Sequence, residues 1–318
     1  MSTAINGKLE LRVQSISYAA QDIYLVELTA LDGRILPEVT PGAHIDLHLP
    51  NGITRSYSLV RAGAMLQSYV VGIKKDVASR GGSRYVHEQL RVGTLLSVSE
   101  PRNHFPLNLR AQHSVLIAGG IGITPIWCMA QFLEQQGASW ELLYSVRTRA
   151  DVALVMQIEM SGGKVHLHID DEVGQVMDLQ RIISAADPGA HFYCCGPAPM
   201  LDAYEQAAAQ RAPENVHMER FSAKAEIALE GGYVVSLART GKEVVIPPGS
   251  SILDVLLAQG INIDYSCQEG ICGCCEVTVL EGDVDHRDAI LSESERAQNR
   301  RMMVCCSGAK SQRLVLDL

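Results

Sequence analysis

The first third of the chain alternates apolar and polar residues in short runs. Such runs cover residues 9–13, 23–28 and 44–49, and turn-forming sequences such as Asp32-Gly33 and Asn51-Gly52 close them. Alternation with a period of two places the apolar side chains on one face of a strand. The pattern predicts a small antiparallel sheet or barrel over residues 1–108.

The middle of the chain changes to apolar strands that alternate with helical segments. Branched apolar residues at 114–118 lead into a glycine-rich turn and a helix over about 126–136, with Thr124 as N-cap and Pro125 at the first helical position. Further strands are predicted at 140–146, 164–169 and 191–195, and further helices over about 150–160 and 179–185. This order predicts a doubly wound parallel sheet over residues 109–222.

The last part of the chain predicts a third domain over residues 230–318, after an exposed linker at 223–230. Strands at 233–237 and 242–246 form a hairpin, and another strand lies at 276–280. A helix is predicted over 252–259, with Ser250 or Ser251 as its cap. The charged sequence at residues 285–288 predicts a solvated turn.

Composition narrows the class of protein without deciding it. The 318 residues suffice for two or three domains, and 47% hydrophobic residues is ordinary for a globular protein. The formal net charge of −9 argues against a nucleic-acid partner. Of this charge, −5 falls on residues 223–318, where an acidic surface either steers a basic partner protein or only keeps the domain soluble.

Two features bear on location. Nine cysteines, and an N-terminus that lacks a basic and then apolar leader, predict a reducing cytoplasm. No charged residue occurs between Ala111 and Leu133, which is long enough to cross a bilayer. The glycines of this stretch fit a buried strand, turn and helix better, so we expect no membrane span.

Four cysteines near the C-terminus carry the strongest chemical signal. Cys267, Cys272 and Cys275 are spaced C-x4-C-x2-C, and Cys305 follows after 29 intervening residues. This is the spacing of plant-type [2Fe–2S] proteins, in which four thiolates hold two irons. Zinc sites favour C-x2-C pairs, and disulfides need an oxidising compartment. Cys274 and Cys306 lie beside the ligands and are expected to be small buried residues, whereas Cys128, Cys194 and Cys195 lie outside the cluster region.

Two motifs in the first domain are candidates for cofactor binding. A basic strand end, Gly72-Ile73-Lys74, precedes the turn Arg80-Gly81-Gly82-Ser83, whose N–H groups, hydroxyl and guanidinium suit phosphate oxygens. The strand Arg55-Ser56-Tyr57-Ser58 has the pattern R-x-Y-S. Taken singly, the turn also fits a flexible loop and the strand an ordinary one; together they favour phosphate binding.

The second domain carries a candidate nucleotide site. Gly119, Gly120 and Gly122 precede the helix that begins near Thr124-Pro125, which places a pyrophosphate at a helix N-terminus, although the full G-x-G-x-x-G is not met. Cys195-Gly196-Pro197 follows a strand at the edge where such sheets bind ligands. Cys195 is either a buried structural thiol or a side chain packed against a nicotinamide.

The choice between NADH and NADPH stays open on the residues themselves. No Asp or Glu that would bind an adenine ribose is evident after the strand at 140–146. Arg147 and Arg149 follow instead, and they would tolerate a 2′-phosphate.

In their order, these motifs resemble the phthalate dioxygenase reductase family, within the ferredoxin–NADP reductase superfamily, along essentially the whole chain. The resemblance rests on residues 55–58, 80–83, 103–107, 119–125, 193–197 and 314–318, and on the cluster cysteines. It implies an antiparallel flavin-binding barrel, a doubly wound nucleotide domain and a C-terminal β-grasp ferredoxin domain. It also implies FMN rather than FAD, NADH as donor and a Rieske-type oxygenase as acceptor.

The resemblance also implies roles for single residues. Tyr57 would cover the isoalloxazine, Arg55 would neutralise phosphate, and Ser58 would lie near the reactive N5. Phe221 falls where the family places an aromatic residue against the flavin, or else it is a core residue between domains. Ser56 stands where the family often has Thr. Ser58 and Cys195 are the predicted catalytic residues, and the predicted cofactor-binding set is Arg55, Ser56, Tyr57, Ser58, Gly72, Ile73, Lys74, Arg80, Gly81, Gly82, Ser83, Gly119, Gly120, Gly122, Thr124, Pro125, Cys195, Gly196, Pro197 and Phe221.

The implied function is the reductase of a two-component oxygenase that acts on an aromatic acid, an aryl ether or a quaternary amine. NADH delivers two electrons together, a flavin can release them singly, and the cluster takes one at a time. Two alternatives stay open. One is a reductase for another acceptor, such as a cytochrome P450, and the other is a non-enzymatic electron carrier or sensor.

Overall fold

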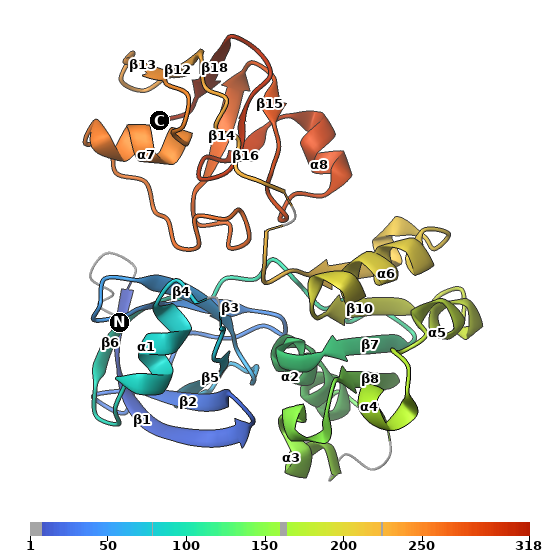
Figure 1. The fold of residues 1–318 in the computed structure, drawn as a ribbon. Coiled ribbons are helices and arrows are strands. Elements are labelled where there is room, and N and C mark those ends of the chain that lie inside the picture. Colours follow the sequence, from blue (N-terminus) through green and yellow to red (C-terminus); the bar gives the residue numbers. More distant parts are fainter. Residues whose placement is uncertain (1–7, 78, 160–163, 224) are drawn as a thin grey trace. The chain divides into compact units, whose positions relative to one another are not determined.

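The structure is a computed structural model, and it describes residues 8–77, 79–159, 164–223 and 225–318. The N-terminal residues that bear on a leader, and Met160 at the end of a predicted helix, lie outside these ranges. The chain divides into two compact units, the first ending at Glu219 and the second beginning at Arg220. Figure 1 labels the elements of both units.

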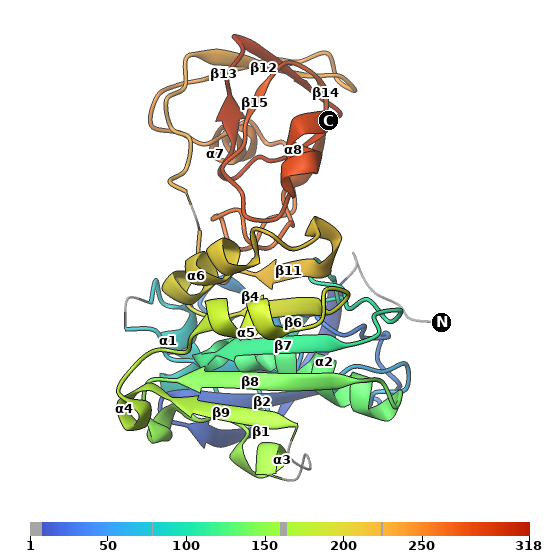
Figure 2. The same ribbon diagram turned by 90° about the vertical axis from the view of Figure 1, so that its right-hand side faces the viewer.

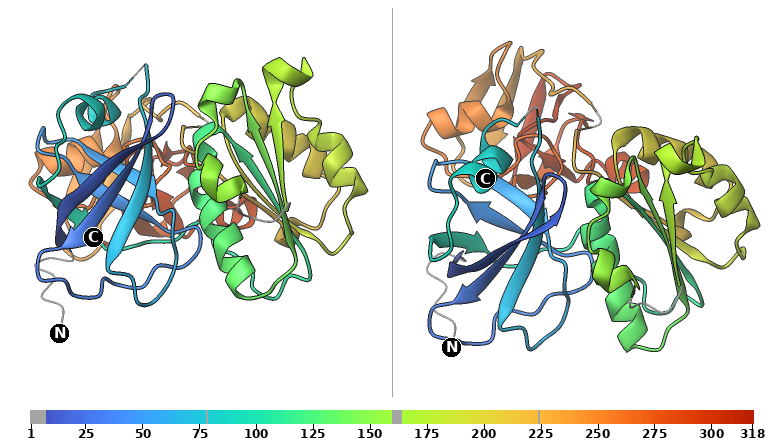
Figure 3. Two further views of the ribbon diagram at one scale, coloured as in Figure 1. Left: turned by 90° about the horizontal axis from the view of Figure 1, so that it is seen from below. Right: turned by 60° about the horizontal axis from the view of Figure 1, so that its bottom comes forward.

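The first unit begins with an antiparallel sheet of six strands in the order β4-β3-β6-β1-β2-β5. An isolated bridge between Leu59 and Val71 joins the chain beyond β4 to β5, at the opposite edge of the sheet, so the sheet curls into a barrel (Figure 3, blue to cyan). Alternate residues of β1, such as Leu9 and Leu11, are fully buried in its core. The bounds are β1 Lys8–Ala20, β2 Ile23–Ala30, β3 His44–His48, β4 Thr54–Ser58, β5 Ser68–Lys74 and β6 Leu95–Ser99, with helix α1 at Gly82–Glu88.

The rest of the first unit is a parallel sheet of five strands in the order β11-β10-β7-β8-β9 (Figure 2). The chain adds β8 and β9 on one side of β7 and then crosses to add β10 and β11 on the other, so the strand order reverses between β7 and β10. Every residue of β7 is buried, as expected for a strand covered on both faces. The strands are β7 Ser114–Gly119, β8 Trp140–Val146, β9 Val165–Ile169, β10 His191–Cys195 and β11 Val216–Glu219. The helices are α2 Ile123–Gln135, α3 Val155–Glu159, α4 Asp170–Val173, α5 Leu179–Ala185 and α6 Ala198–Ala208, with short 3-10 turns η1 Gly120–Gly122, η2 Arg149–Asp151 and η3 Pro213–Asn215.

The uncharged stretch between Ala111 and Leu133 forms β7, η1 and most of α2, as predicted. The predicted start of the helix is wrong, however. Because η1 runs directly into α2, Gly122 is the N-cap, and Thr124 and Pro125 lie inside the first turn. The Thr124 hydroxyl donates to the Ile121 carbonyl at 3.0 Å instead of capping the helix. Across the described ranges, no helix is both long and apolar enough to span a membrane.

A second prediction is also wrong: residues 150–160 do not form one helix. The 3-10 turn η2 is followed by the short α3, and Leu154 between them has a φ of 60°. A β-branched or bulky residue rarely adopts a positive φ, and never within a regular helix. The helix pattern of the sequence is therefore interrupted by one left-handed residue.

The second unit has a sheet of five strands in the order β13-β12-β18-β14-β16, and helix α7 packs on its core. Ser251 caps α7 through a capping box with Asp254, which confirms one of the two predicted caps. Asp288 is buried, so the prediction of a solvated turn at 285–288 is wrong. The bounds are β12 Tyr233–Leu237, β13 Glu243–Ile246, α7 Ile252–Ala258, β14 Glu276–Glu281, β15 Val284–Asp285, α8 Glu293–Gln298, β16 Arg301–Met303, β17 Gly308–Ala309 and β18 Arg313–Leu316.

Candidate functional site

The predicted phosphate site of the barrel is assembled around the start of α1. Gly81 is the N-cap of α1, with a φ of 106° that favours glycine. The Arg55 side chain lies against Gly82, where an added Cβ would stand 2.7 Å from Arg55 Cγ. The first N–H groups of a helix have no partner within it and suit phosphate oxygens. The residues at this place therefore fit the phosphate of a flavin nucleotide.

The strand that carries the R-x-Y-S pattern is held by a buried carboxylate that the sequence did not reveal. The Ser56 hydroxyl donates to Asp46 Oδ1 at 2.6 Å, and Arg102 Nη2 lies 2.6 Å from Asp46 Oδ2. Burial raises the pKa of Tyr57 to about 12, so its ring stands in the site as a neutral phenol. Nothing in the alternating sequence of β3 marks Asp46 as a buried residue, since its pattern is that of any strand.

The residues of the candidate nucleotide site lie where the strand order reverses, at the carboxyl ends of β7 and β10. Doubly wound sheets bind their ligands at such points. The two strand ends approach so closely that a Cβ on Gly122 would lie 2.1 Å from the Cys195 carbonyl oxygen. A Cβ on Gly119 would lie 2.7 Å from Pro197 Cδ. The glycines of both predicted motifs therefore let the two strand ends pack closely against each other.

The barrel and the parallel sheet meet beside these strand ends. A Cβ on Gly72 of β5 would lie 2.5 Å from Thr124 Cγ2 of α2. The Gln131 side chain of α2 donates to the Val60 carbonyl of the barrel at 2.9 Å. Predicted flavin-side and nucleotide-side residues are thus brought together within one compact unit.

Ser58 and Cys195 meet on a residue that sequence reasoning missed, Glu219. Ser58 Oγ donates to Glu219 Oε2 at 3.3 Å, and Cys195 Sγ lies 3.8 Å from the same oxygen. The parallel register of β10 and β11 pairs Cys195 with Glu219, which explains why the two side chains are neighbours. The only local signal was the alternation of residues 216–219, which is too short to predict a strand with this register.

Burial sets the protonation of this group. Loss of water raises the pKa of Glu219 to about 8, although the hydrogen bonds from Ser58 and Cys195 lower it. Burial also raises the pKa of Cys195 well above its ordinary value. At neutral pH the group is therefore uncharged: a hydroxyl, a carboxylic acid and a thiol.

Acidic residues that sequence analysis did not find follow the neighbouring strand, β9. Ser145, near the end of β8, donates to Asp170 Oδ1 at 3.2 Å. Glu172 binds Arg149 through two hydrogen bonds, both of 2.7 Å. The usual position for a ribose-binding acid is directly after β8, whereas these acidic residues follow β9, one strand later in the chain.

The four predicted ligand cysteines are all buried in the second unit. Their thiols lie within hydrogen-bonding reach of one another: Cys267 interacts with both Cys272 and Cys305, and Cys305 also interacts with Cys275. Among the described residues, no three His, Cys, Asp or Glu side chains are arranged around one ion. Four neighbouring thiols fit a [2Fe–2S] cluster, in which four thiolates share two irons.

Backbone N–H groups of the cluster loop point at these sulfurs. The N–H groups of Glu269 and Ile271 lie 3.3 and 3.4 Å from Cys267 Sγ. Such hydrogen bonds stabilise thiolate ligands and help to set a cluster's potential. Cys306 is buried as expected, whereas Cys274 is only partly buried, which corrects the prediction for that residue.

Comparison with known proteins agrees with this arrangement. Residues 235–310 match the model of the 2Fe-2S iron-sulfur cluster binding domain. The chain is 49% identical to the phenoxybenzoate dioxygenase subunit beta of Ectopseudomonas oleovorans, over 100% of this chain and 99% of that protein. It matches the structure of phthalate dioxygenase reductase, described as modular for electron transfer from pyridine nucleotides to [2Fe–2S], with 36% identity and a TM-score of 0.74 over 98% of both chains. The chain belongs to the phthalate dioxygenase reductase family.

Membership of the phthalate dioxygenase reductase family confirms the predicted fold and makes the chain an oxidoreductase with an iron–sulfur domain. A further structural relative is an intact type IV self-sufficient cytochrome P450 monooxygenase, at 38% identity and a TM-score of 0.89. That match covers 98% of this chain and 41% of the P450 chain. The family fold thus occurs both as a separate chain and within a longer one.

Proposed function

We propose that this reductase takes electrons from NADH and delivers them, by way of FMN and a [2Fe–2S] cluster, to a Rieske-type oxygenase. A bound flavin accepts two electrons together and releases them singly, which links a two-electron donor to a one-electron cluster. One observation carries the proposal: Ser58, on the flavin-side strand, and Cys195, on the nucleotide-side strand, both contact Glu219.

The chain's own residues act by positioning and by excluding water. Ser58 and Cys195 are buried, and their shared partner fixes the distance between the two strand ends. Hydride transfer gains most from such fixed geometry, because the reacting atoms must be close and aligned. In this proposal Ser58 would hold the flavin near its N5, and Cys195 and Gly196 would place the nicotinamide. Phe221, 39% exposed, stays a candidate for contact with the flavin.

FMN is the proposed flavin. Arg55 and the first turn of α1 form a cradle that fits one phosphate group. We expect acid extraction of the purified protein to release FMN, identified by chromatography. Recovery of FAD would contradict this part of the proposal.

NADH is proposed over NADPH because of the acidic residues that follow β9. Glu172 neutralises Arg149, and Asp170 and Asp171 add negative charge at the same strand end. A 2′-phosphate placed here would meet carboxylates rather than unpaired arginines.

The variant Glu172→Gln should release Arg149 and improve the use of NADPH. We expect the ratio of kcat/KM for NADPH to that for NADH to rise by roughly twofold to fivefold, as for one surface ion pair redirected to a phosphate. Glu134→Gln is a matched control, since Glu134 also forms a solvent-exposed ion pair, with Lys164, in a different part of the unit. An unchanged ratio in Glu172→Gln would show that these residues do not select the nucleotide.

The partner is tested by reconstitution. The reductase, NADH and a Rieske-type oxygenase should consume oxygen only when the oxygenase receives its substrate, tried from a panel of aromatic acids, aryl ethers and quaternary amines. A cytochrome P450 is the second candidate acceptor, favoured by the self-sufficient P450 that shares this fold. Reduction of P450s but of no Rieske oxygenase would reverse the order of the two candidates.

The remaining proposals concern the surroundings of the protein. No disulfide joins cysteines in the described part of the chain, as expected in a reducing cytoplasm, and we propose that the reductase acts there. The intact group of Ser58, Cys195 and Glu219 favours an enzyme over an electron carrier whose flavin and nucleotide sites have decayed.

A further inference from the structure

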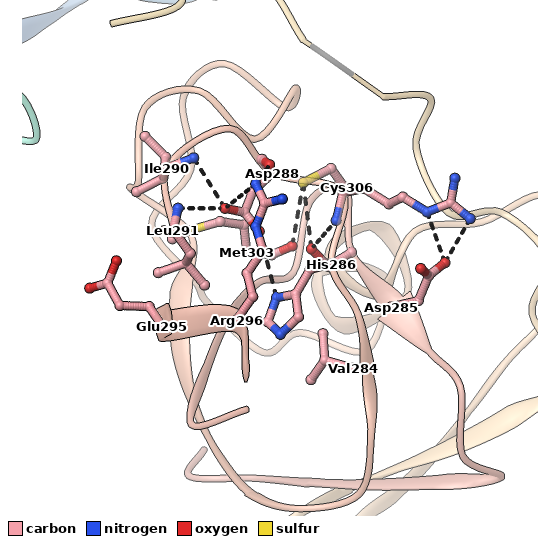
Figure 4. Close-up of polar contacts among 12 residues, drawn as sticks. Val284, Asp285, His286, Asp288, Ile290, Leu291, Glu295, Arg296, Met303 and Cys306 are labelled. Carbon is pink, nitrogen blue, oxygen red and sulfur yellow. Dashed lines mark hydrogen bonds and ion pairs between the residues drawn. The ribbon is translucent and has the colours of Figure 1, made fainter. Parts of the chain in front are cut away.

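A group of titratable side chains, His286, Asp288 and Arg296, lies together in the segment from β15 to α8 (Figure 4). The Asp288 side chain is completely buried and that of His286 is 9% exposed, whereas that of Arg296 is 33% exposed. Buried charges cost free energy unless they are paired or required for function. Neither the reductase chemistry nor the cluster ligands described above account for these residues.

The segment that carries Asp288 is attached to the cluster loop through Gly270. The Ala289 N–H donates to the Gly270 carbonyl at 2.9 Å. Gly270 has a φ of 69°, and a Cβ there would lie 2.9 Å from Asp288 Cα and 2.4 Å from Cys306 Sγ. The Gly270 N–H donates in turn to the sulfur of Cys305, a cluster ligand. One residue therefore connects Asp288 with a ligand sulfur.

The Asp288 carboxylate has a well-defined environment. Its Oδ2 accepts from the N–H groups of Ile290 at 3.1 Å and Leu291 at 2.8 Å. Arg296 Nη2 lies 3.9 Å from the same oxygen and donates to the Asp288 carbonyl. N–H donors and a guanidinium around one oxygen are the environment of a carboxylate anion rather than of a neutral acid.

Arg296, not His286, is the countercharge of this carboxylate. His286 Nδ1 lies 3.7 Å from Asp288 Oδ1, and neither ring nitrogen has a hydrogen-bond partner in the described part of the chain. Burial lowers the pKa of His286, which keeps the ring neutral near pH 7. The group therefore carries one buried negative charge, on Asp288, and one partly exposed positive charge, on Arg296.

The turn itself does not require a charge at residue 288. An asparagine oxygen would accept the two N–H bonds equally well. A fixed charge near an iron–sulfur cluster, however, changes the free energy of adding an electron: a negative charge opposes it and a positive charge favours it. The charge of Asp288 thus has an effect that its hydrogen bonds do not explain.

We propose that Asp288 and Arg296 are positioning residues of the cluster, which hold Gly270 against Cys305 and set the cluster's reduction potential by their opposite charges. The inference rests on the proposed [2Fe–2S] site in this unit. Reduction of that site takes up one electron and needs no proton from these residues.

The test is a redox titration of the cluster in the full-length holoprotein, followed by electron paramagnetic resonance. Asp288→Asn should raise the potential and Arg296→Gln should lower it. Each change should alter the one-electron equilibrium constant about tenfold, which corresponds to about 59 mV. The double variant should fall between the two. Asp285→Asn is the matched control, because Asp285 lies in the same segment but pairs with Arg287. The cluster's reduction potential should not change in this variant.

Structural support alone gives a different result. In that case both substitutions would lower the iron content, and the clusters that remain would keep the wild-type potential, which would overturn the proposal. If Asp288→Asn does not retain a cluster, the variants Arg296→Lys and Arg296→Gln test the proposal instead. The charge-conserving lysine should keep the cluster's reduction potential, and the glutamine should lower it. Equal potentials in these two variants would also overturn it. A wild-type protein without iron and sulfide would instead refute the proposed function.

Discussion

Replacing Cys272 with serine should remove the [2Fe–2S] cluster while NADH-dependent reduction of ferricyanide continues. Cys272 is buried and pairs with Cys267, and its sulfur accepts the Cys267 N–H at 3.5 Å, so a serine oxygen would leave one iron with an incomplete ligand set. Ferricyanide can take electrons from the flavin without the cluster. Iron and sulfide content, ferricyanide reduction and cytochrome c reduction are the measurements.

The neighbouring residue provides the control for this variant. Cys274 is only partly buried and lies outside the ligand spacing, so Cys274→Ser should keep both the cluster and cytochrome c reduction. If ferricyanide reduction were also lost in a folded Cys272→Ser protein, the proposed order of flavin before cluster would be wrong.

Replacing Glu219 with glutamine should slow the reduction of the flavin by NADH and remove a pH dependence. The pKa of Glu219 is about 8, so the wild-type acid is neutral at pH 7 and gains a buried negative charge as the pH rises through 8. We expect the wild-type rate, measured by stopped-flow absorbance, to fall across that range. In the variant the rate should be about tenfold lower at pH 7, as for one positioned hydrogen-bonding group, and flat across pH 8.

The same substitution should stabilise the fold at high pH. The folded pKa of about 8 lies above the ordinary value of 4.5, so the folded state holds a proton that the unfolded state releases between these values. The stability contributed by Glu219 is therefore complete below pH 4.5 and is lost as the pH rises through 8.

Above pH 8, the free energy of unfolding, measured with denaturant, should be roughly 1–3 kcal/mol higher for Glu219→Gln than for the wild type. Glu214→Gln, an exposed change just before the same strand, should leave both the rate and the stability unchanged. A variant of Glu219 that is less active and also less stable at high pH would show that the carboxyl group is not buried as described.

Much of the fold was readable from the sequence because the relevant signals are local. The C-x4-C-x2-C spacing fixes the cluster loop by itself, and the alternation of strands and helices in residues 114–195 is a repeated pattern. The R-x-Y-S strand and the glycine turn gained meaning from their order along the chain. Each of these features depends only on residues close together in sequence.

The features that the sequence did not reveal depend on distant residues. Glu219 reaches Cys195 only through the register of β10 and β11. Asp288 stands in a run of charged residues that is typical of a solvated turn, and its burial follows from packing against Gly270. The first turn of α2 begins before Thr124 because a 3-10 turn continues into it. Local patterns carry no information about such contacts.

The most direct test of the whole account is an anaerobic titration with NADH, followed by absorbance and electron paramagnetic resonance. The account predicts that NADH bleaches a flavin absorbance and that the signal of a reduced [2Fe–2S] cluster then appears in the same protein. A preparation without yellow cofactor and without iron, or one whose cluster stays oxidised while NADH is consumed, would contradict it.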